Sequence, residues 1–418
     1  MASMQDVFAQ HLQSYQRGRR LHPRESRAAA CILKCYTPEA GSHVDCCPHG
    51  HYTEQTFHAC RHRSCPRCAD RPRQRWTQAE LQRLLPCPHF HSVFTLPHEL
   101  LALWEFNREA MIALLMDSVR SSLLSMLGDP RHLGATPGLL LSLHTWGRNL
   151  SHHPHVHALV SAGGVRADGR WLATRAGFLL PLAPLRKLFA AKLLAGLSEL
   201  LNQAALCLPS RLPDPHWRHV ISQLYRRHWN IQINAPYASG RSVALYLARY
   251  AKGGPLPKDR ALFMHDDSVS FDYTDHRDAQ RKRLRLRADE FIARILWHAP
   301  PKGVHTIRHA GLYATAARAQ YRNALLALAL PLPTQHALPT PLPPPSTRPT
   351  CPTCGSTLQR LFFPSRHAAD QISYQSALHP TTFTPPPALL GPTRRSNGHS
   401  TASHSPPASY SRLRTAGC

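Results

Sequence analysis

The sequence predicts an α+β protein with a small N-terminal zinc-binding domain and a Pro-rich C-terminal tail. Strand and helix patterns alternate through the middle of the 418 residues, seven of the 12 cysteines lie between Cys31 and Cys68, and 17 of the 38 prolines fall in the last 88 residues. Cysteine clusters in a reducing compartment are typical of metal binding, and Pro-rich segments bury too little apolar surface to fold. We therefore expect a zinc-binding domain at 1–82, an α+β domain at 83–328 and a mostly disordered tail at 329–418.

The α+β domain is expected to interleave strands with helices. Runs of β-branched, aromatic or apolar residues predict strands at 89–96, 138–145, 155–161 and 229–234 and a hairpin over 263–273. Apolar residues at helical spacing predict helices at 107–127, 182–206, 242–252 and 289–297. Gly163 and Gly164 are expected to turn the chain after the third strand.

The charge points to an acidic partner. Lys plus Arg is 50 and Asp plus Glu is 24, so the net charge is 50 − 24 = +26. Nucleic acid is the first candidate, because basic side chains that neutralise phosphates release condensed counterions; the alternative is a merely basic protein from a GC-rich genome. No run of about 18 uncharged apolar residues predicts a membrane span, and residues 1–11 lack the pattern of a secretion signal, so we expect a cytoplasmic protein without a membrane partner.

The cysteine cluster predicts at least one structural zinc site. Cys65 and Cys68 form a C-x2-C pair, Cys46 and His49 have the same separation, and 15 residues lie between His49 and Cys65, which suits one tetrahedral ion. Several neighbours are further candidate ligands, so the exact set stays open: Cys60 above all, then Cys47, His51, His58 and His62. Cys31 and Cys35, one helical turn apart, are candidates for a second site, and free thiols are the alternative to any zinc.

Two other groups of residues accompany this cluster. Arg61, Arg63 and Arg67 surround the C-x2-C pair, together with arginines at 71, 73 and 75, and predict a face that contacts phosphates. Near the C-terminus, Cys351 and Cys354 form half a zinc site with no evident partner pair, unless His367 or Cys418 folds back.

A histidine pair predicts a second kind of metal site. In a strand, alternate side chains share a face, so His155 and His157 point the same way and can hold one cation between them. The alternative is a histidine-rich turn. We expect His91 and His144 to lie in the core or behind the ligands.

Two tyrosines are candidate nucleophiles. Tyr246 and Tyr250 lie four residues apart on a predicted helix and therefore share one face of it. Arg249 and Lys252 are nearby cations that would assist a phenol of pKa about 10 to act through its oxygen. Aromatic packing in the core is the alternative interpretation.

The ordered set of motifs resembles one known family. The stretches CRHRSCPRC (60–68), FHSVFTLP (90–97), TWGRNLSHHPHVHALV (145–160), YLARY (246–250) and PKGVHTIRHAGL (301–312) are similar to those of IS-ninety-one-like rolling-circle transposases, which are HUH endonucleases with two tyrosines. The resemblance runs from about residue 30 to residue 315, and CPTCG at 351–355 is similar to a small C-terminal element of the family.

The resemblance implies a fold and a mechanism. The fold would be an HUH-type antiparallel sheet with flanking helices, and residues 1–82 would recognise DNA. His155 and His157 would bind Mg²⁺ or Mn²⁺, while Tyr246 and Tyr250 would nick and join single-stranded transposon ends and target DNA through 5′-phosphotyrosine intermediates. The protein would act at the bacterial nucleoid, with Arg249 and Lys252 as further DNA contacts.

The chain departs from the family pattern in two places. In the zinc module, residues 46–51 read CCPHGH, so a histidine stands in for one of the family's cysteines. Arg148 stands where the family often carries Gln, so the resemblance leaves the third metal ligand open among Asn149, His152, His153 and a water. Two alternative functions remain: a zinc-dependent DNA-binding protein without catalysis, such as a decayed transposase, and an RNA-binding zinc protein.

Overall fold

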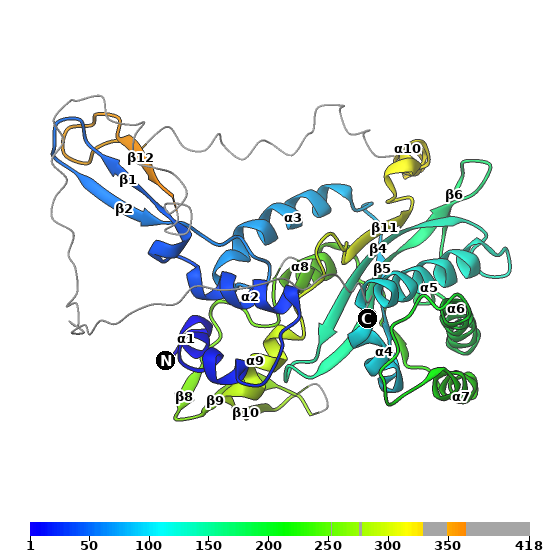
Figure 1. Cartoon of the computed structure of the whole chain (residues 1–418). Coiled ribbons are helices and arrows are strands. Elements are labelled where there is room, and N and C mark those ends of the chain that lie inside the picture. Colours follow the sequence, from blue (N-terminus) through cyan, green and yellow to red (C-terminus); the bar gives the residue numbers. More distant parts are fainter. Residues whose placement is uncertain (252, 276–277, 329–348, 365–418) are drawn as a thin grey trace, which may run out of the picture. The chain divides into compact units, whose positions relative to one another are not determined.

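The fold centres on an antiparallel six-stranded sheet, seen in a computed structural model that describes residues 1–251, 253–275, 278–328 and 349–364 (Figure 1). The strand order is β11-β4-β5-β3-β7, and β6 pairs with β5 at one end. The strands are β3 (His89–Thr95), β4 (Thr136–Trp146), β5 (His152–Val165), β6 (Trp171–Ala173), β7 (Ile231–Ile233) and β11 (Ile307–Gly311). The predicted α+β class is confirmed.

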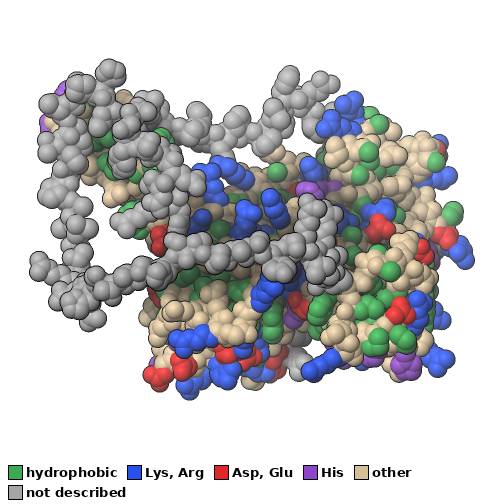
Figure 2. Space-filling model, viewed as in Figure 1, with side chains coloured by type: hydrophobic (Ala, Val, Ile, Leu, Met, Phe, Trp, Pro, Cys, Tyr) green, Lys and Arg blue, Asp and Glu red, His purple; other side chains and the backbone are tan. Residues whose placement is uncertain are grey.

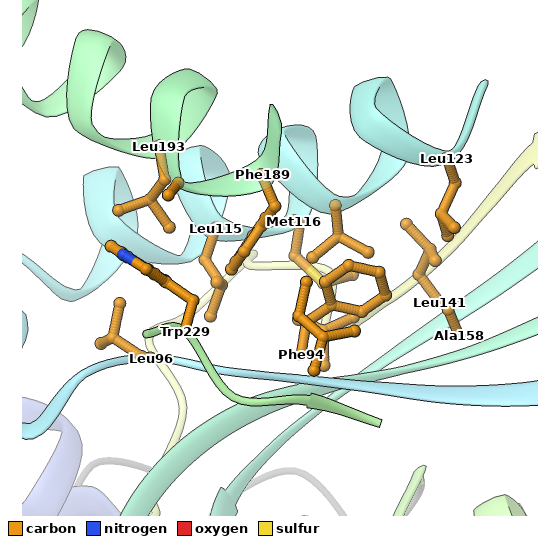
Figure 3. Packing of buried hydrophobic residues seen from close by; sticks show 14 of the residues in the cluster. Phe94, Leu96, Leu115, Met116, Leu123, Leu141, Ala158, Phe189, Leu193 and Trp229 are labelled. Carbon is orange, nitrogen blue, oxygen red and sulfur yellow. The ribbon is translucent and has the colours of Figure 1, made fainter. Parts of the chain in front are cut away.

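One face of the sheet carries the main apolar core. The helices on this face are α4 (Leu101–Phe106), α5 (Arg108–Gly128), α6 (Leu182–Asn202) and α7 (Asp214–Tyr225). Figure 3 shows Phe94, Leu141 and Ala158 on the sheet pointing toward Leu115 and Phe189 on α5 and α6. Side chains alternate along each strand, so the residues between these apolar positions must face the other side.

The opposite face is covered by α3 (Asp70–Arg83), α8 (Arg241–Ala251) and α10 (Arg318–Ala327). Here Leu140 of β4 and Leu159 of β5 pack with Val243 and Leu247 of α8. This second, smaller core matters for function, because the histidines of β4 and β5 share its side of the sheet.

The N-terminal helices share a third core with a later part of the chain. Helices α1 (Met4–Gln16) and α2 (Pro23–Lys34) pack with α9 (Ala288–Leu296) and with the sheet β10-β9-β8. Those strands are β8 (Phe263–His265), β9 (Ser268–Thr274) and β10 (Arg281–Arg287). The boundary expected at residue 82 therefore separates two segments that are packed on one core.

A small three-stranded sheet joins distant parts of the chain. Strand β1 (Ser42–Cys46) pairs with β2 (Thr53–Phe57) on one side and with β12 (Gln359–Phe363) on the other. The part of the expected tail at 349–364 is therefore folded against the N-terminal region. The rest of that tail, including His367 and Cys418, lies outside the described residues.

Every predicted strand and helix of the α+β domain is found, with shifted ends, but the predicted glycine turn is wrong. Gly163 and Gly164 lie inside β5, which continues to Val165. A Cβ at Gly163 would lie 2.4 Å from the Trp171 ring, and one at Gly164 would lie 2.5 Å from the Thr136 carbonyl oxygen. Close packing of neighbouring strands, rather than a turn, is the reason for both glycines.

Helix α5 is long and apolar enough to cross a membrane by length and composition alone. In this structure 56% of its most apolar 18-residue stretch is buried against the sheet and α6, as in the core helix of a globular domain.

Phe94→Ala is expected to lower the free energy of unfolding by about 3–5 kcal/mol, because Phe94 is fully buried and its ring lies 5.1 Å from that of Phe189. Urea unfolding followed by tryptophan fluorescence measures this change. Phe178→Ala is the control: Phe178 is 44% exposed, and its loss should cost roughly 0.5 kcal/mol. Equal effects of the two substitutions would contradict the assignment of Phe94 to the core.

Candidate functional site

Three histidines converge on the side of the sheet that α8 covers. His155 and His157 lie on β5, and His144 lies directly opposite His155 on β4. One ring nitrogen from each lies within 4.8 Å of those of the other two. The register of the β4–β5 hairpin therefore creates a three-imidazole cluster, whose shared face follows from strand alternation.

A backbone contact orients His155. Its Nδ1 donates a hydrogen bond of 2.6 Å to the carbonyl oxygen of His153. A neutral imidazole carries one proton, so this bond leaves the Nε2 lone pair unprotonated and available to a metal ion.

His157 is held by a chain of polar side chains on β3 and the end of β7. Its Nδ1 lies 2.7 Å from Nε2 of His91, and Nδ1 of His91 lies 3.2 Å from the side-chain amide nitrogen of Asn234. The rings of His91 and His157 are stacked at 5.0 Å. His91 was expected in the core or behind the ligands, and it lies directly behind His157.

Burial keeps these imidazoles neutral. Desolvation lowers the pKa of His155 and of His91 to about 4, and it lowers the pKa of His144 and His157 well below the usual value. The neutral ring is the form that binds metal ions, so at neutral pH the cluster fits a divalent cation without first losing protons.

The third member of the cluster is not one of the residues expected to complete the site. Arg148 donates to the carbonyl oxygen of Thr274, and His152 lies 2.9 Å from Glu105, so both are engaged elsewhere. Asn149 accepts a hydrogen bond from the Ser151 backbone. His144, expected in the core or behind the ligands, instead joins His155 and His157 in the cluster.

Helix α8 places the two candidate tyrosines. The backbone positions of Tyr246 and Tyr250 lie in α8, whose residues Val243 and Leu247 pack on the histidine side of the sheet. The side chains of Tyr246, Arg249 and Tyr250, and all of Lys252, lie outside the described residues.

Four cysteines form a second candidate metal centre, and they match the predicted zinc ligands only in part. The predicted ligands Cys60, Cys65 and Cys68 come together with Cys35 from the end of α2, with all four sulfur atoms within 4.8 Å of one another. Sγ of Cys68 lies 3.5 Å from that of Cys35 and 3.7 Å from that of Cys60. These spacings fit a tetrahedral zinc ion, whose Zn–S bonds of about 2.3 Å separate the sulfur atoms by about 3.8 Å.

Cys46 and His49 do not join this group, in contrast to the predicted ligand set. Sγ of Cys46 lies on the β12 side of β1, 3.5 Å from the carbonyl oxygen of Gln359. The ring of His49 is packed beside that of His51. Cys31, expected to pair with Cys35, also lies outside the group. One helical turn of separation did not bring the two thiols to the same candidate ion.

The expected phosphate-binding arginines divide into two kinds. Arg61 is exposed, and Arg67 is exposed while also donating to Gln5 and lying over the Tyr36 ring. Arg63 is half-buried and donates a 2.6 Å hydrogen bond to Thr306, so it is engaged inside the protein. In Figure 2, Lys and Arg side chains gather over the area that α3 occupies in Figure 1, where the exposed arginines at 71, 75 and 83 lie.

Sequence reasoning did not place His144 among the ligands and did not identify Asn234, and it assigned Cys35 to a separate zinc site with Cys31. A regular hairpin closed at Gly147 and Ser151 would place His144 opposite Pro154. The register shift between His144 and Trp146 places it opposite His155 instead, and nothing in the sequence signalled that shift. Asn234 reaches His91 only because β7 pairs with β3, a contact between residues 143 positions apart.

Comparisons with known proteins agree on the kind of protein that this chain resembles. Residues 7–96 match a family described as "Transposase zinc-binding domain", and residues 138–320 match one described as "Putative transposase". The chain is 33% identical to "Putative transposase y4qJ" of Sinorhizobium fredii over 80% of this chain and 86% of that protein. It is 31% identical to "Transposase for insertion sequence element IS801" of Pseudomonas savastanoi pv. phaseolicola over 69% of this chain and 70% of that protein. No solved structure matches.

Cys35→Ser is expected to remove about one zinc ion per chain and to lower the melting temperature, because Cys35 lies in both the four-cysteine group and the N-terminal core. Zinc content by mass spectrometry and thermal unfolding measure the two effects. Cys31→Ser, one helical turn earlier, is the matched control and should keep its zinc. Equal zinc loss in both variants would contradict this ligand set.

Proposed function

The chain belongs to the IS-ninety-one-like family of insertion-sequence transposases, whose substrate is DNA, and from this we propose that it nicks and joins single-stranded DNA through covalent phosphotyrosine intermediates. The zinc-binding domain of the family makes zinc a structural component of the protein. The proposal concerns the reaction at the histidine cluster and helix α8.

One observation carries the proposal: the three-histidine cluster lies on the side of the sheet against which α8 packs. Val243 and Leu247 pack α8 on Leu140 and Leu159, which face the same side of the sheet as the histidines of β4 and β5. Helical spacing puts positions 246 and 250 on the same side of α8 as positions 243 and 247. Both candidate nucleophile positions therefore lie on the side of the helix that packs against the sheet.

The chemistry follows from these positions. A divalent cation bound by His144, His155 and His157 would polarise the scissile phosphodiester and stabilise its developing charge. The tyrosine oxygen forms a bond to phosphorus and loses its proton, the bond from phosphorus to the 3′-oxygen breaks, and that oxygen takes up a proton. The 5′ end then stays attached to the protein, so the second tyrosine can repeat the step on another strand.

The rest of the chain supplies DNA contacts in this proposal. Arg61 and Arg67, the exposed arginines of α3, and Arg249 and Lys252 would bind phosphates of the DNA. The site of action would be DNA in the bacterial cytoplasm. Arg63 is not part of this surface, because its guanidinium is bonded to Thr306.

Tyr246→Phe and Tyr250→Phe test the nucleophiles. With labelled single-stranded DNA that carries the element's own end, and with Mg²⁺ or Mn²⁺, each single variant should still form a covalent adduct while the double variant forms none. Denaturing gels that retain protein–DNA adducts measure this. Tyr225→Phe, at a 52% exposed tyrosine on α7, is the control and should behave as wild type.

Two outcomes would contradict the proposal. An adduct in the double variant would place the nucleophile elsewhere. A wild-type protein that binds DNA but neither cleaves it nor forms an adduct with any divalent ion would favour the alternative of a DNA-binding protein without catalysis.

His91→Phe is expected to weaken Mn²⁺ binding by roughly 10–100-fold, because metal ligands depend on the side chains that orient them. If Nε2 of His157 binds the ion, its Nδ1–H must donate to Nε2 of His91, and Nδ1–H of His91 then needs an acceptor at position 234. The amide nitrogen of Asn234 lies 3.2 Å from that Nδ1, so metal binding requires the amide to turn its oxygen toward His91. Asn234→Asp supplies only oxygens there and should keep or increase the affinity, whereas Asn234→Leu should lower it.

Titration calorimetry with Mn²⁺ measures these affinities, and unchanged zinc content shows that each variant is folded. His89→Phe is the control, because His89 shares the strand and face of His91 but lies beside Tyr313. Equal weakening by Asn234→Asp and Asn234→Leu would mean that position 234 contributes packing and does not orient His91.

A further inference from the structure

Four metal-binding side chains outside the sites described above meet at the end of the small N-terminal sheet. Cys47 and His51 lie in the β1–β2 turn, and Cys351 and Cys354 lie just before β12. Their ligand atoms all lie within 4.8 Å of one another. Sγ of Cys47 lies 3.5 Å from Sγ of Cys354 and 3.9 Å from Nδ1 of His51.

The backbone around these residues repeats the geometry of the four-cysteine centre. The amide of His49 donates to Sγ of Cys47 at 3.4 Å, just as the amide of His62 donates to Sγ of Cys60 at 3.5 Å. The amide of Gly355 donates to the carbonyl oxygen of Cys351, and Gly355 has φ 71°, so the C-x2-C turn closes on a residue without a Cβ. The turn that carries Cys47 and the turn that carries Cys351 and Cys354 therefore bring their sulfur atoms together.

The spacing fits one tetrahedral ion. Zn–S bonds of about 2.3 Å separate two coordinated sulfur atoms by about 3.8 Å, close to the separations found here. Cys47, Cys351 and Cys354 are free thiols, so the separation of Cys47 and Cys354 is not a disulfide bond. Three cysteines and one histidine are a frequent ligand set of structural zinc sites.

Apart from these ligands, the described contacts that stabilise the small sheet are few. Its own apolar core consists of Cys47, Cys351 and Leu358 with Tyr52 packed against them, and every residue of β12 is exposed. The bidentate contact of Arg360 with Asp45 links β12 to β1, but a partly exposed ion pair contributes about 1 kcal/mol at most. A sheet of this size with so small a core is typical of metal-stabilised folds.

We propose that Cys47, His51, Cys351 and Cys354 bind a second structural zinc ion, which fastens residues 349–364 to the N-terminal sheet. The matched zinc-binding family covers residues 7–96 and therefore only half of this site. The C-terminal C-x2-C element is then a part of the N-terminal zinc-binding region, reached across more than 300 residues of chain. The proposal does not depend on the reaction at the histidine cluster.

Zinc stoichiometry of the full chain tests the proposal. Wild type should contain two zinc ions per chain by mass spectrometry, and the double variant Cys351→Ser/Cys354→Ser should contain one. Cys35→Ser should also contain one, and the triple variant none. Cys46→Ser is the matched control, because Cys46 is adjacent to Cys47 but lies outside both groups, and it should retain two.

A second pair of variants separates loss of a ligand from loss of folding. His51→Cys keeps four ligands and should retain two zinc ions, whereas His51→Ala should retain fewer. After replacement of zinc by Co²⁺, His51→Cys should gain thiolate-to-metal absorption relative to wild type. One zinc ion in wild type, or two in Cys351→Ser/Cys354→Ser, would overturn the proposal, and so would an unchanged Co²⁺ spectrum in His51→Cys.

Discussion

The antiparallel register of β3, β4 and β5 is the constraint on which the site depends. It places His144 opposite His155, Ser142 opposite His157 and Val93 opposite His157 from the other side. A shift of one residue in either pairing would turn the histidines toward α5 and α6 and bring apolar side chains under α8. The large core on the first face of the sheet therefore stabilises the register, and the register positions the cluster on the second face.

The N-terminal region depends on different forces. Helices α1 and α2 are buried on a core that they share with α9, and the four-cysteine centre lies where α2 ends and the C-x2-C turn begins. Burial raises the pKa of the Cys35 thiol well above its usual value, so a cation at this centre stabilises the thiolate that burial disfavours. Apolar packing and metal binding thus act together at this point, whereas the small sheet of β1, β2 and β12 has almost no apolar core.

Local patterns in the sequence were sufficient for every strand and helix predicted in the α+β domain and for parts of each site. His155 and His157 share a face because any strand alternates, and Cys60, Cys65 and Cys68 lie close because the chain turns tightly there. The partners that complete each group come from tertiary pairing. Cys35 reaches its group from the end of α2, Asn234 reaches His91 through β7, and Cys351 reaches Cys47 through β12. The turn expected at Gly163 failed for a similar reason, since the need for glycine came from the neighbouring Trp171.

The central claim is that the cluster of His144, His155 and His157 is the metal site of the transposase. Anomalous diffraction at the manganese edge, from crystals of the zinc-loaded protein equilibrated with Mn²⁺, tests it most directly. The account predicts one manganese peak bounded by the three imidazoles, with Nε2 of His155 among the ligands. A peak held by other residues, or no peak at a concentration that supports DNA cleavage, would contradict it.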